Sequence, residues 1–296
     1  MATADLSNTL GAEFIGGMIS AILYGITTLQ TYLYFMNYPD DGVAVKLFVM
    51  IIWILDTVHV SFMCHALYYY LVSNYGVASP WVDNVWSLYA SITVNLCIAC
   101  LVQTFFTVKI FYLCHRRLRW LVTIPIIVTI LAHLGFGTVT VTFLFSKTFS
   151  ASSQLTLYSV TTGAANVMSD VLITIALCVL LRKYVSYVVC SRAKRLINTL
   201  IIYTIDRCLL TSFTGSLVTI AEVVMSHVDS NTSWYVAIDF ILSKLYANSL
   251  LASLNTRNYL RSRESVEQAV FNVNTIQFAS SSNSWPPDNT SRPESV

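Results

Sequence analysis

Long apolar stretches alternate with short polar loops along most of this chain, from Leu10 to Asn255. Each stretch is about 20 residues or longer, the length that an α-helix needs to cross a hydrocarbon core of roughly 30 Å. The pattern predicts an all-α integral membrane bundle of seven transmembrane helices. We expect these helices over residues 11–35, 47–71, 86–112, 120–145, 157–181, 196–225 and 234–255.

Lysine and arginine are distributed unevenly between the predicted helices. The loops after the first, third and fifth helices and the segment after the seventh contain twelve of them, whereas the N-terminus and the other three loops contain only Lys147. Because basic loops stay on the cytosolic side of a membrane, we expect the N-terminus outside and the C-terminus in the cytosol. The twelve are Lys46, Arg116, Arg117, Arg119, Arg182, Lys183, Arg192, Lys194, Arg195, Arg257, Arg261 and Arg263.

Three regions follow from this topology: a short external N-terminus over residues 1–10, a membrane domain over 11–257 and a cytosolic tail over 258–296. The tail is rich in Ser, Asn and Pro, a composition that buries too little apolar surface to fold, so we expect it to be largely disordered. A cytosolic protein would bind at the tail and the basic loops. Asn231 begins an Asn-Thr-Ser sequence in a predicted external loop, which makes it a glycosylation candidate.

Composition agrees with a membrane protein and argues against other classes. Hydrophobic residues make up 55% of the chain and charged residues 11%, whereas soluble domains carry about 25% charged residues. The net charge of +2 is too small to indicate a nucleic-acid partner. The lipid bilayer is therefore the expected partner, in the plasma membrane or an endomembrane.

Polar residues recur every four positions within several predicted helices. This spacing keeps side chains on one face of a helix and predicts a bundle with a polar interior. The plainer interpretation is hydrogen bonding between helices, worth about 0.6 kcal/mol per contact on average. The main positions are Ser87, Ser91, Asn95 and Gln103 in the third helix, Thr162, Asn166 and Asp170 in the fifth, and Lys244 and Asn248 in the seventh.

Four ionisable residues, Asp56, Asp170, Arg207 and Lys244, lie at a similar depth near the middle of their predicted helices. A lone charge at that depth costs about 2.5–3.5 kcal/mol on insertion scales. We therefore expect these side chains to gather into a paired layer inside the bundle. Two interpretations stay open. The first is an ion-pair lock that only fixes helix register. The second is a functional site that uses the same charges, either as a pocket for an unknown small ligand or ion or as a switch.

His59 follows Asp56 by three residues and shares its helix face, so the two could form an Asp–His pair for proton relay. No other histidine in a predicted helix offers a matching ligand, so we expect no metal. Lys244 raises the alternative of a retinal Schiff base, but the third helix has no carboxylate to act as counter-ion, and we expect no cofactor. No nucleophile–base–orienter arrangement can be recognised, so we do not expect an enzyme.

Several stretches, taken in order, resemble one fungal family of seven-span membrane proteins catalogued as domain of unknown function 6534. The resemblance implies a multi-pass membrane protein and brings no established activity. It runs from the first predicted helix to Arg257, and the tail lies outside it. The stretches are residues 23–25 with Gln30 and Tyr32, then 38–41, 53–59, 103–106 with Lys109, 169–174, 196–205 and 244–257.

The leading hypothesis is a receptor- or sensor-like bundle with a buried polar and charged layer. The third helix ends without an acid–arginine–aromatic triplet and the seventh lacks an Asn-Pro-x-x-Tyr element, so a classical G-protein-coupled receptor is not indicated. The alternative is a proton-coupled transporter or channel using Asp56, His59, Asp170 and Lys244, followed by a retinal-binding photoreceptor and an intramembrane hydrolase.

Overall fold

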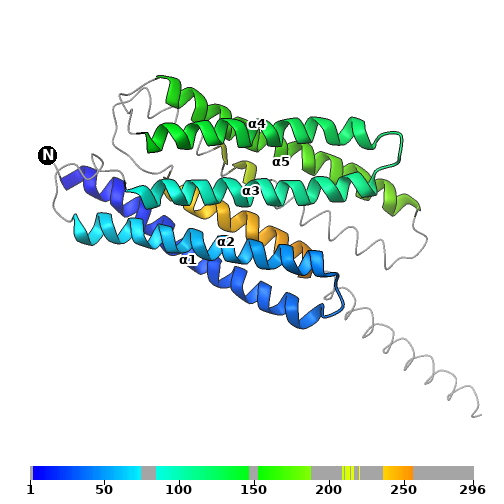
Figure 1. The fold of residues 1–296 in the computed structure, drawn as a ribbon, viewed down its shortest axis with the longest axis horizontal. Helices are drawn as coiled ribbons and strands as arrows, with labels where there is room; N and C mark the ends of the chain where they lie inside the picture. Colours follow the sequence, from blue (N-terminus) through cyan, green and yellow to red (C-terminus); the bar gives the residue numbers. More distant parts are fainter. Residues whose placement is uncertain are drawn as a thin grey trace, which may run out of the picture. The chain divides into compact units, whose positions relative to one another are not determined.

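The computed structural model describes residues 3–74, 85–146, 153–187 and 236–255, together with a few residues between 209 and 220. Every long element in these ranges is a helix, and the helices belong to one compact unit, Met1–Asn255 (Figure 1). They are α1 (Thr3–Asn37), α2 (Val43–Tyr68) with the π-helical turn η1 (Tyr69–Ser73), α3 (Trp86–Leu113), α4 (Arg119–Phe145), α5 (Ser153–Tyr187) and a last helix, Val236–Asn255, called helix 236–255 below.

Six of the described helices are long and apolar enough to cross a membrane. Their outer faces expose large apolar side chains such as Ile22, Leu121 and Leu131, which contact lipid in a protein of this kind. The chain is therefore a multi-pass membrane protein, and six of the predicted spans are confirmed. The predicted span 196–225, with Arg207, lies almost entirely outside the described residues, as do Asn231 and the tail 258–296.

Several helices extend beyond the predicted spans: α2 begins at Val43 rather than at residue 47, and α5 runs from Ser153 to Tyr187 rather than over 157–181. α1 begins at Thr3 rather than at residue 11, so most of the segment expected as a short external N-terminus is helical. Beyond Tyr68, α2 continues as η1, where the Asn74 N–H donates to the Tyr69 carbonyl at 3.0 Å. Hydropathy marks only the part of a helix that lies in hydrocarbon, and a helical backbone can continue past it.

Helical periodicity explains which side chains turn inward. The buried residues of α2 follow one another at alternating spacings of four and three, which defines a single stripe. Asp56 and His59 belong to this stripe, so the helix that buries apolar side chains also carries ionisable groups into the core. The stripe consists of Val49, Ile52, Asp56, His59, Met63, Ala66 and, in η1, Tyr70.

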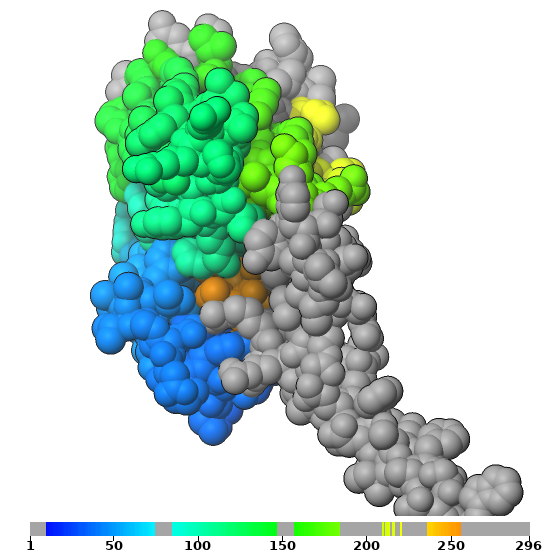
Figure 2. All heavy atoms as spheres, turned by 90° about the vertical axis from the view of Figure 1, so that its right-hand side faces the viewer, coloured from blue at the N-terminus to red at the C-terminus, as the bar shows by residue number. Residues whose placement is uncertain are grey.

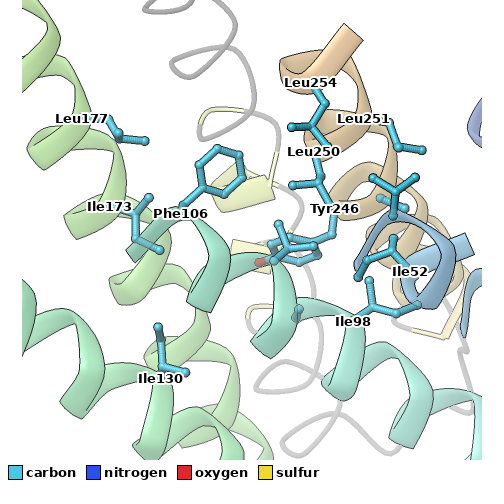
Figure 3. Close-up of a cluster of buried hydrophobic side chains, with 14 of the residues drawn as sticks. Ile52, Ile98, Phe106, Ile130, Ile173, Leu177, Tyr246, Leu250, Leu251 and Leu254 are labelled. Carbon is cyan, nitrogen blue, oxygen red and sulfur yellow. The ribbon is translucent and has the colours of Figure 1, made fainter. Parts of the chain in front are cut away.

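Helix 236–255 occupies the middle of the bundle. In its most apolar window 56% of the residues are buried, against 28–44% in the other spans. Figure 2 shows its end (orange) between α1–α2 (blue) and α3–α5 (green). A Cβ atom on Gly16 of α1 would lie 2.6 Å from the Ala237 carbonyl oxygen, so the two backbones meet where only glycine fits. Figure 3 shows Tyr246, Leu250 and Leu254 of this helix amid the apolar core.

Candidate functional site

Lys244 and Asp56 form an ion pair that is closed off from solvent. The Lys244 Nζ lies 2.5 Å from Asp56 Oδ1 and also donates to the Asp56 backbone carbonyl at 3.0 Å. Both side chains are 0% exposed. The ring of Tyr24 lies 5.6 Å from the same nitrogen, in cation–π range. The pair therefore joins α2 to helix 236–255, with α1 covering the ammonium group.

His59 lies beside this pair but does not complete a metal site. Its Nε2 lies 3.4 Å from the Ser243 hydroxyl, and its Nδ1 has no hydrogen-bond partner among the described residues. His65 is exposed instead, and its Nδ1 lies 2.8 Å from the Ser87 hydroxyl. Within the ranges that the structure describes, no group of three or more His, Cys, Asp or Glu side chains is placed to hold a metal ion.

A second buried network joins α3, α5 and helix 236–255. The Gln103 Nε2 donates to Asn166 Oδ1 at 2.8 Å and to Asp170 Oδ1 at 3.2 Å. The Tyr246 hydroxyl lies 3.0 Å from Asn166 Oδ1 and 2.6 Å from Asp170 Oδ2. Carboxylate and amide oxygens thus collect donors from two other helices, which is how buried polar groups in membrane proteins are satisfied.

A third contact, between Asn95 of α3 and Asp239 of helix 236–255, leaves acceptors unused. The Asn95 Nδ2 donates to Asp239 Oδ1 at 2.6 Å. The other oxygen of each side chain, Asn95 Oδ1 and Asp239 Oδ2, is buried and receives no hydrogen bond from the residues described. Such an unmet acceptor is costly in a low-dielectric interior and marks a place where a donor would be stabilised.

Asn95 and Asp239 line a cavity of about 120 Å³ between α3, α4, α5 and helix 236–255. His133 of α4 lines it as well, and its Nδ1 lies 3.8 Å from the Cys100 sulfur. Asn166 belongs both to the cavity wall and to the second network. A molecule in the cavity would therefore touch a residue that bonds to Gln103 and Tyr246. The polar wall comprises Asn95, His133, Thr140, Ser159, Thr162, Asn166 and Asp239.

The structure thus divides the predicted site residues among separate contacts. Lys244 pairs with Asp56, whereas Asp170 is engaged two residues further along helix 236–255, by Tyr246. Asn248 faces α1, where its Nδ2 donates to the Leu23 carbonyl at 3.0 Å. Asp56, His59, Asn95, Gln103, Asn166, Asp170 and Lys244 are buried and Asn248 is half-buried, while Arg207 lies outside the described residues.

Several participants were not predicted. Tyr246 is fully buried and donates to Asp170, yet in the sequence it reads as one more aromatic residue of an apolar helix. Asp239, which accepts from Asn95, and Ser243, which lies beside His59, were not among the predicted site residues. Glu13 of α1 is buried as well, at 1% exposed, and the sequence signal for it was an acidic residue inside the first predicted helix.

Comparison with known protein families gives a match over roughly the last third of the membrane domain. No curated protein and no solved structure shows significant similarity to the chain. Residues 166–259, which include Asn166, Asp170, Asp239, Lys244 and Tyr246, match the model of a family to which no activity is assigned. The resemblance predicted from the sequence is confirmed over that range: residues 166–259 match the Family of unknown function (DUF6534).

Proposed function

We propose that this protein is a receptor- or sensor-like membrane bundle, with the N-terminus outside and the C-terminus in the cytosol, whose small ligand occupies the cavity between α3, α4, α5 and helix 236–255. The observation that carries the proposal is the position of Asn166. It lines the cavity, accepts a hydrogen bond from Gln103 and lies 3.0 Å from the Tyr246 hydroxyl, so occupancy of the cavity and the arrangement of three helices are linked at one side chain.

Helix 236–255 is held differently on its two sides, and this difference determines how a ligand would move it. On the α1–α2 side, the Lys244–Asp56 pair and the Gly16–Ala237 contact hold helix 236–255 in place. On the α3–α5 side, the same helix is held by hydrogen bonds that a ligand can compete for or strengthen. A ligand that stabilises one set of these bonds would tilt the helix about its fixed side, a shift of the kind that couples distant sites in membrane bundles.

The end of the bundle that would report the shift is basic. Within the described ranges, every Lys and Arg except Lys244 lies in or close to the α1–α2 loop, the α3–α4 loop or the C-terminal end of α5. These residues are Lys46, Lys109, Arg116, Arg117, Arg119, Arg182 and Lys183. This distribution supports the cytosolic orientation of that end and makes it the surface where a cytosolic protein would bind.

Transport is the competing function, because a cavity beside buried carboxylates also suits proton coupling. The described cavity does not include Asp56 or Lys244, and their direct pairing supports a lock rather than an ion path. The same separation gives a retinal linked to Lys244 no place in this cavity. We therefore rank sensing above transport and do not propose retinal binding.

The test uses the full chain in nanodiscs, with a pair of spin labels at positions 182 and 255, where α5 is exposed and helix 236–255 ends. A panel of cationic, neutral and anionic polar compounds of up to about six non-hydrogen atoms is added, and the label distance is measured. We expect at least one compound to change the distance in the parent protein and in Asn248→Ala, but not in Asn166→Ala. A proton flux in liposomes that Asp170→Asn abolishes, without any distance change, would overturn the proposal in favour of transport.

A further inference from the structure

We propose that the cavity binds a small protonated amine, held by Asp239 and Asn95. This inference rests on the proposed function, since it names the chemistry of the ligand for the same cavity. The inference follows from three features of the cavity. Its wall offers hydrogen-bond acceptors, the wall includes one carboxylate, and the volume is small.

The wall offers acceptors whose hydrogen-bonding capacity is unused. Asp239 Oδ1 already accepts the Asn95 amide at 2.6 Å, while Asp239 Oδ2 and Asn95 Oδ1 receive no donor from the described residues. Asn95 is 6% exposed, so bulk water does not serve it. A carboxylate and an amide oxygen side by side are satisfied by a group that donates more than one hydrogen bond.

The hydroxyl groups across the cavity add acceptors rather than donors. The Thr140 hydroxyl donates to the Phe136 carbonyl at 2.9 Å, and the Thr162 hydroxyl donates to the Tyr158 carbonyl at 2.8 Å. The two hydroxyl oxygens lie 3.4 Å apart. Each hydroxyl has one hydrogen and a backbone carbonyl of its own helix within reach of it, so each oxygen keeps a lone pair that can accept a hydrogen bond from a ligand.

Charge favours a cation over a neutral donor. Asp239 precedes Lys244 by five residues, which separates the two side chains by about 140° around the helix. Lys244 forms its ion pair with Asp56 of α2 instead. Lys244 therefore does not contact the Asp239 carboxylate. An ammonium group carries one positive charge and three donors on a compact head, which matches a carboxylate oxygen with neighbouring amide and hydroxyl oxygens.

Size limits the rest of the ligand. A cavity of about 150 Å³ holds benzene, so the cavity of about 120 Å³ takes a molecule of up to about six non-hydrogen atoms. Ile92, Leu96 and Leu242 provide an apolar part of the wall for a short carbon chain. Ethylammonium and ethanolammonium are therefore suitable probes, with Kd roughly in the millimolar to micromolar range expected for ligands of this size.

The experiment measures binding of ethylammonium to the full chain in nanodiscs by its effect on thermal unfolding, with tetramethylammonium and ethanol as matched probes. Tetramethylammonium carries the charge without N–H donors, and ethanol offers one donor without charge. We expect ethylammonium to raise the melting temperature in a saturable manner and the other two to bind at least about tenfold more weakly, because a charge-assisted hydrogen bond is lost.

Variants then locate the site. We expect Asp239→Asn to weaken ethylammonium binding about tenfold to a hundredfold and Ala99→Leu, which fills the cavity from α3, to weaken it similarly. Asp40→Asn removes an exposed acid from the α1–α2 loop and should leave binding unchanged. Should the Asp239 variant fail to fold, the selectivity among the three probes still decides the matter in the parent protein.

Equal effects of ethylammonium and tetramethylammonium, no saturable effect of ethylammonium, or full binding by Asp239→Asn would each overturn the assignment. The outcomes separate this inference from the proposed function. A distance change caused only by a neutral or anionic compound would retain the sensor and reject the amine. Saturable amine binding at Asp239 without any distance change would retain the amine site and reject the sensor.

Discussion

Removing one partner of the Lys244–Asp56 pair should destabilise the bundle far more than removing both. The perturbations are Lys244→Met, Asp56→Asn and the double variant. Methionine is close in length to lysine and carries no charge, and asparagine is nearly isosteric with aspartate, so packing changes little. Both side chains are fully buried, so Lys244→Met removes the ammonium donor from the Asp56 carboxylate and from the Asp56 backbone carbonyl at once.

The geometry sets the magnitude. At 2.5 Å the gross attraction between two unit charges is about 7 kcal/mol with an effective dielectric constant of 20, and desolvation of both groups offsets much of it. Breaking a buried pair by removing one partner costs about 3–5 kcal/mol. Replacing both by well-packed groups of similar volume without charge removes the desolvation cost together with the attraction, so its net cost is small. We expect Lys244→Met to lose about 3–5 kcal/mol and the double variant to recover most of that.

The assay is reversible unfolding in mixed micelles titrated with a denaturing detergent, which gives a free energy of unfolding for each variant and a coupling energy from the cycle. A matched control is Lys46→Met, a half-buried lysine at the start of α2 whose Nζ donates to the Pro39 carbonyl. A coupling energy below about 0.5 kcal/mol, the spread expected of independent sites, would refute the idea that the pair locks helix 236–255 to α2.

Further substitutions test other contacts. Tyr246→Phe removes the hydroxyl that donates a hydrogen bond to Asp170 at 2.6 Å and should lower the free energy of unfolding by about 1.5–3 kcal/mol. A change in this free energy no larger than the experimental error would show that the hydrogen bond contributes nothing to stability. Gly16→Val should prevent folding or lower the melting temperature strongly, because its Cβ would meet backbone at 2.6 Å, whereas Gly25→Ala, with open space around it, should be neutral. The orientation can be tested by glycosylation. Glycosidase treatment of protein from eukaryotic cells should increase gel mobility in the parent and not in Asn231→Gln. Glycosylation of the C-terminal tail instead would show that the topology is the reverse of the one proposed.

The spans and their inward faces could be predicted from sequence because both depend on local pattern. Apolar length fixes where a helix can cross hydrocarbon, and four-residue spacing fixes which side chains share a face. The third predicted helix illustrates this, since Ser87, Ser91, Asn95 and Gln103 are all buried on α3. The helical start at Thr3 could not be predicted in this way, because it lies outside the apolar run.

The pairing of the charges could not be predicted, for a physical reason. Asp56 and Asp170 lie at similar depth, so depth alone does not decide which of them meets Lys244. The choice depends on how helix 236–255 is rotated between its neighbours, and that rotation is set by contacts such as Gly16 against Ala237. The role of Tyr246 was missed for the same reason, since a tyrosine in an apolar helix looks like packing until its neighbours are known.

Our central claim is that the buried polar residues form two separable parts, a lock at Asp56–Lys244 and a ligand cavity at Asn95–Asp239. The most direct test is an ethylammonium binding isotherm of the double variant Asp56→Asn/Lys244→Met beside that of Asp239→Asn. We expect a Kd close to that of the parent for the double variant and a loss of binding for Asp239→Asn. Loss of binding in the double variant while it remains folded, or an unchanged Kd in Asp239→Asn, would contradict it.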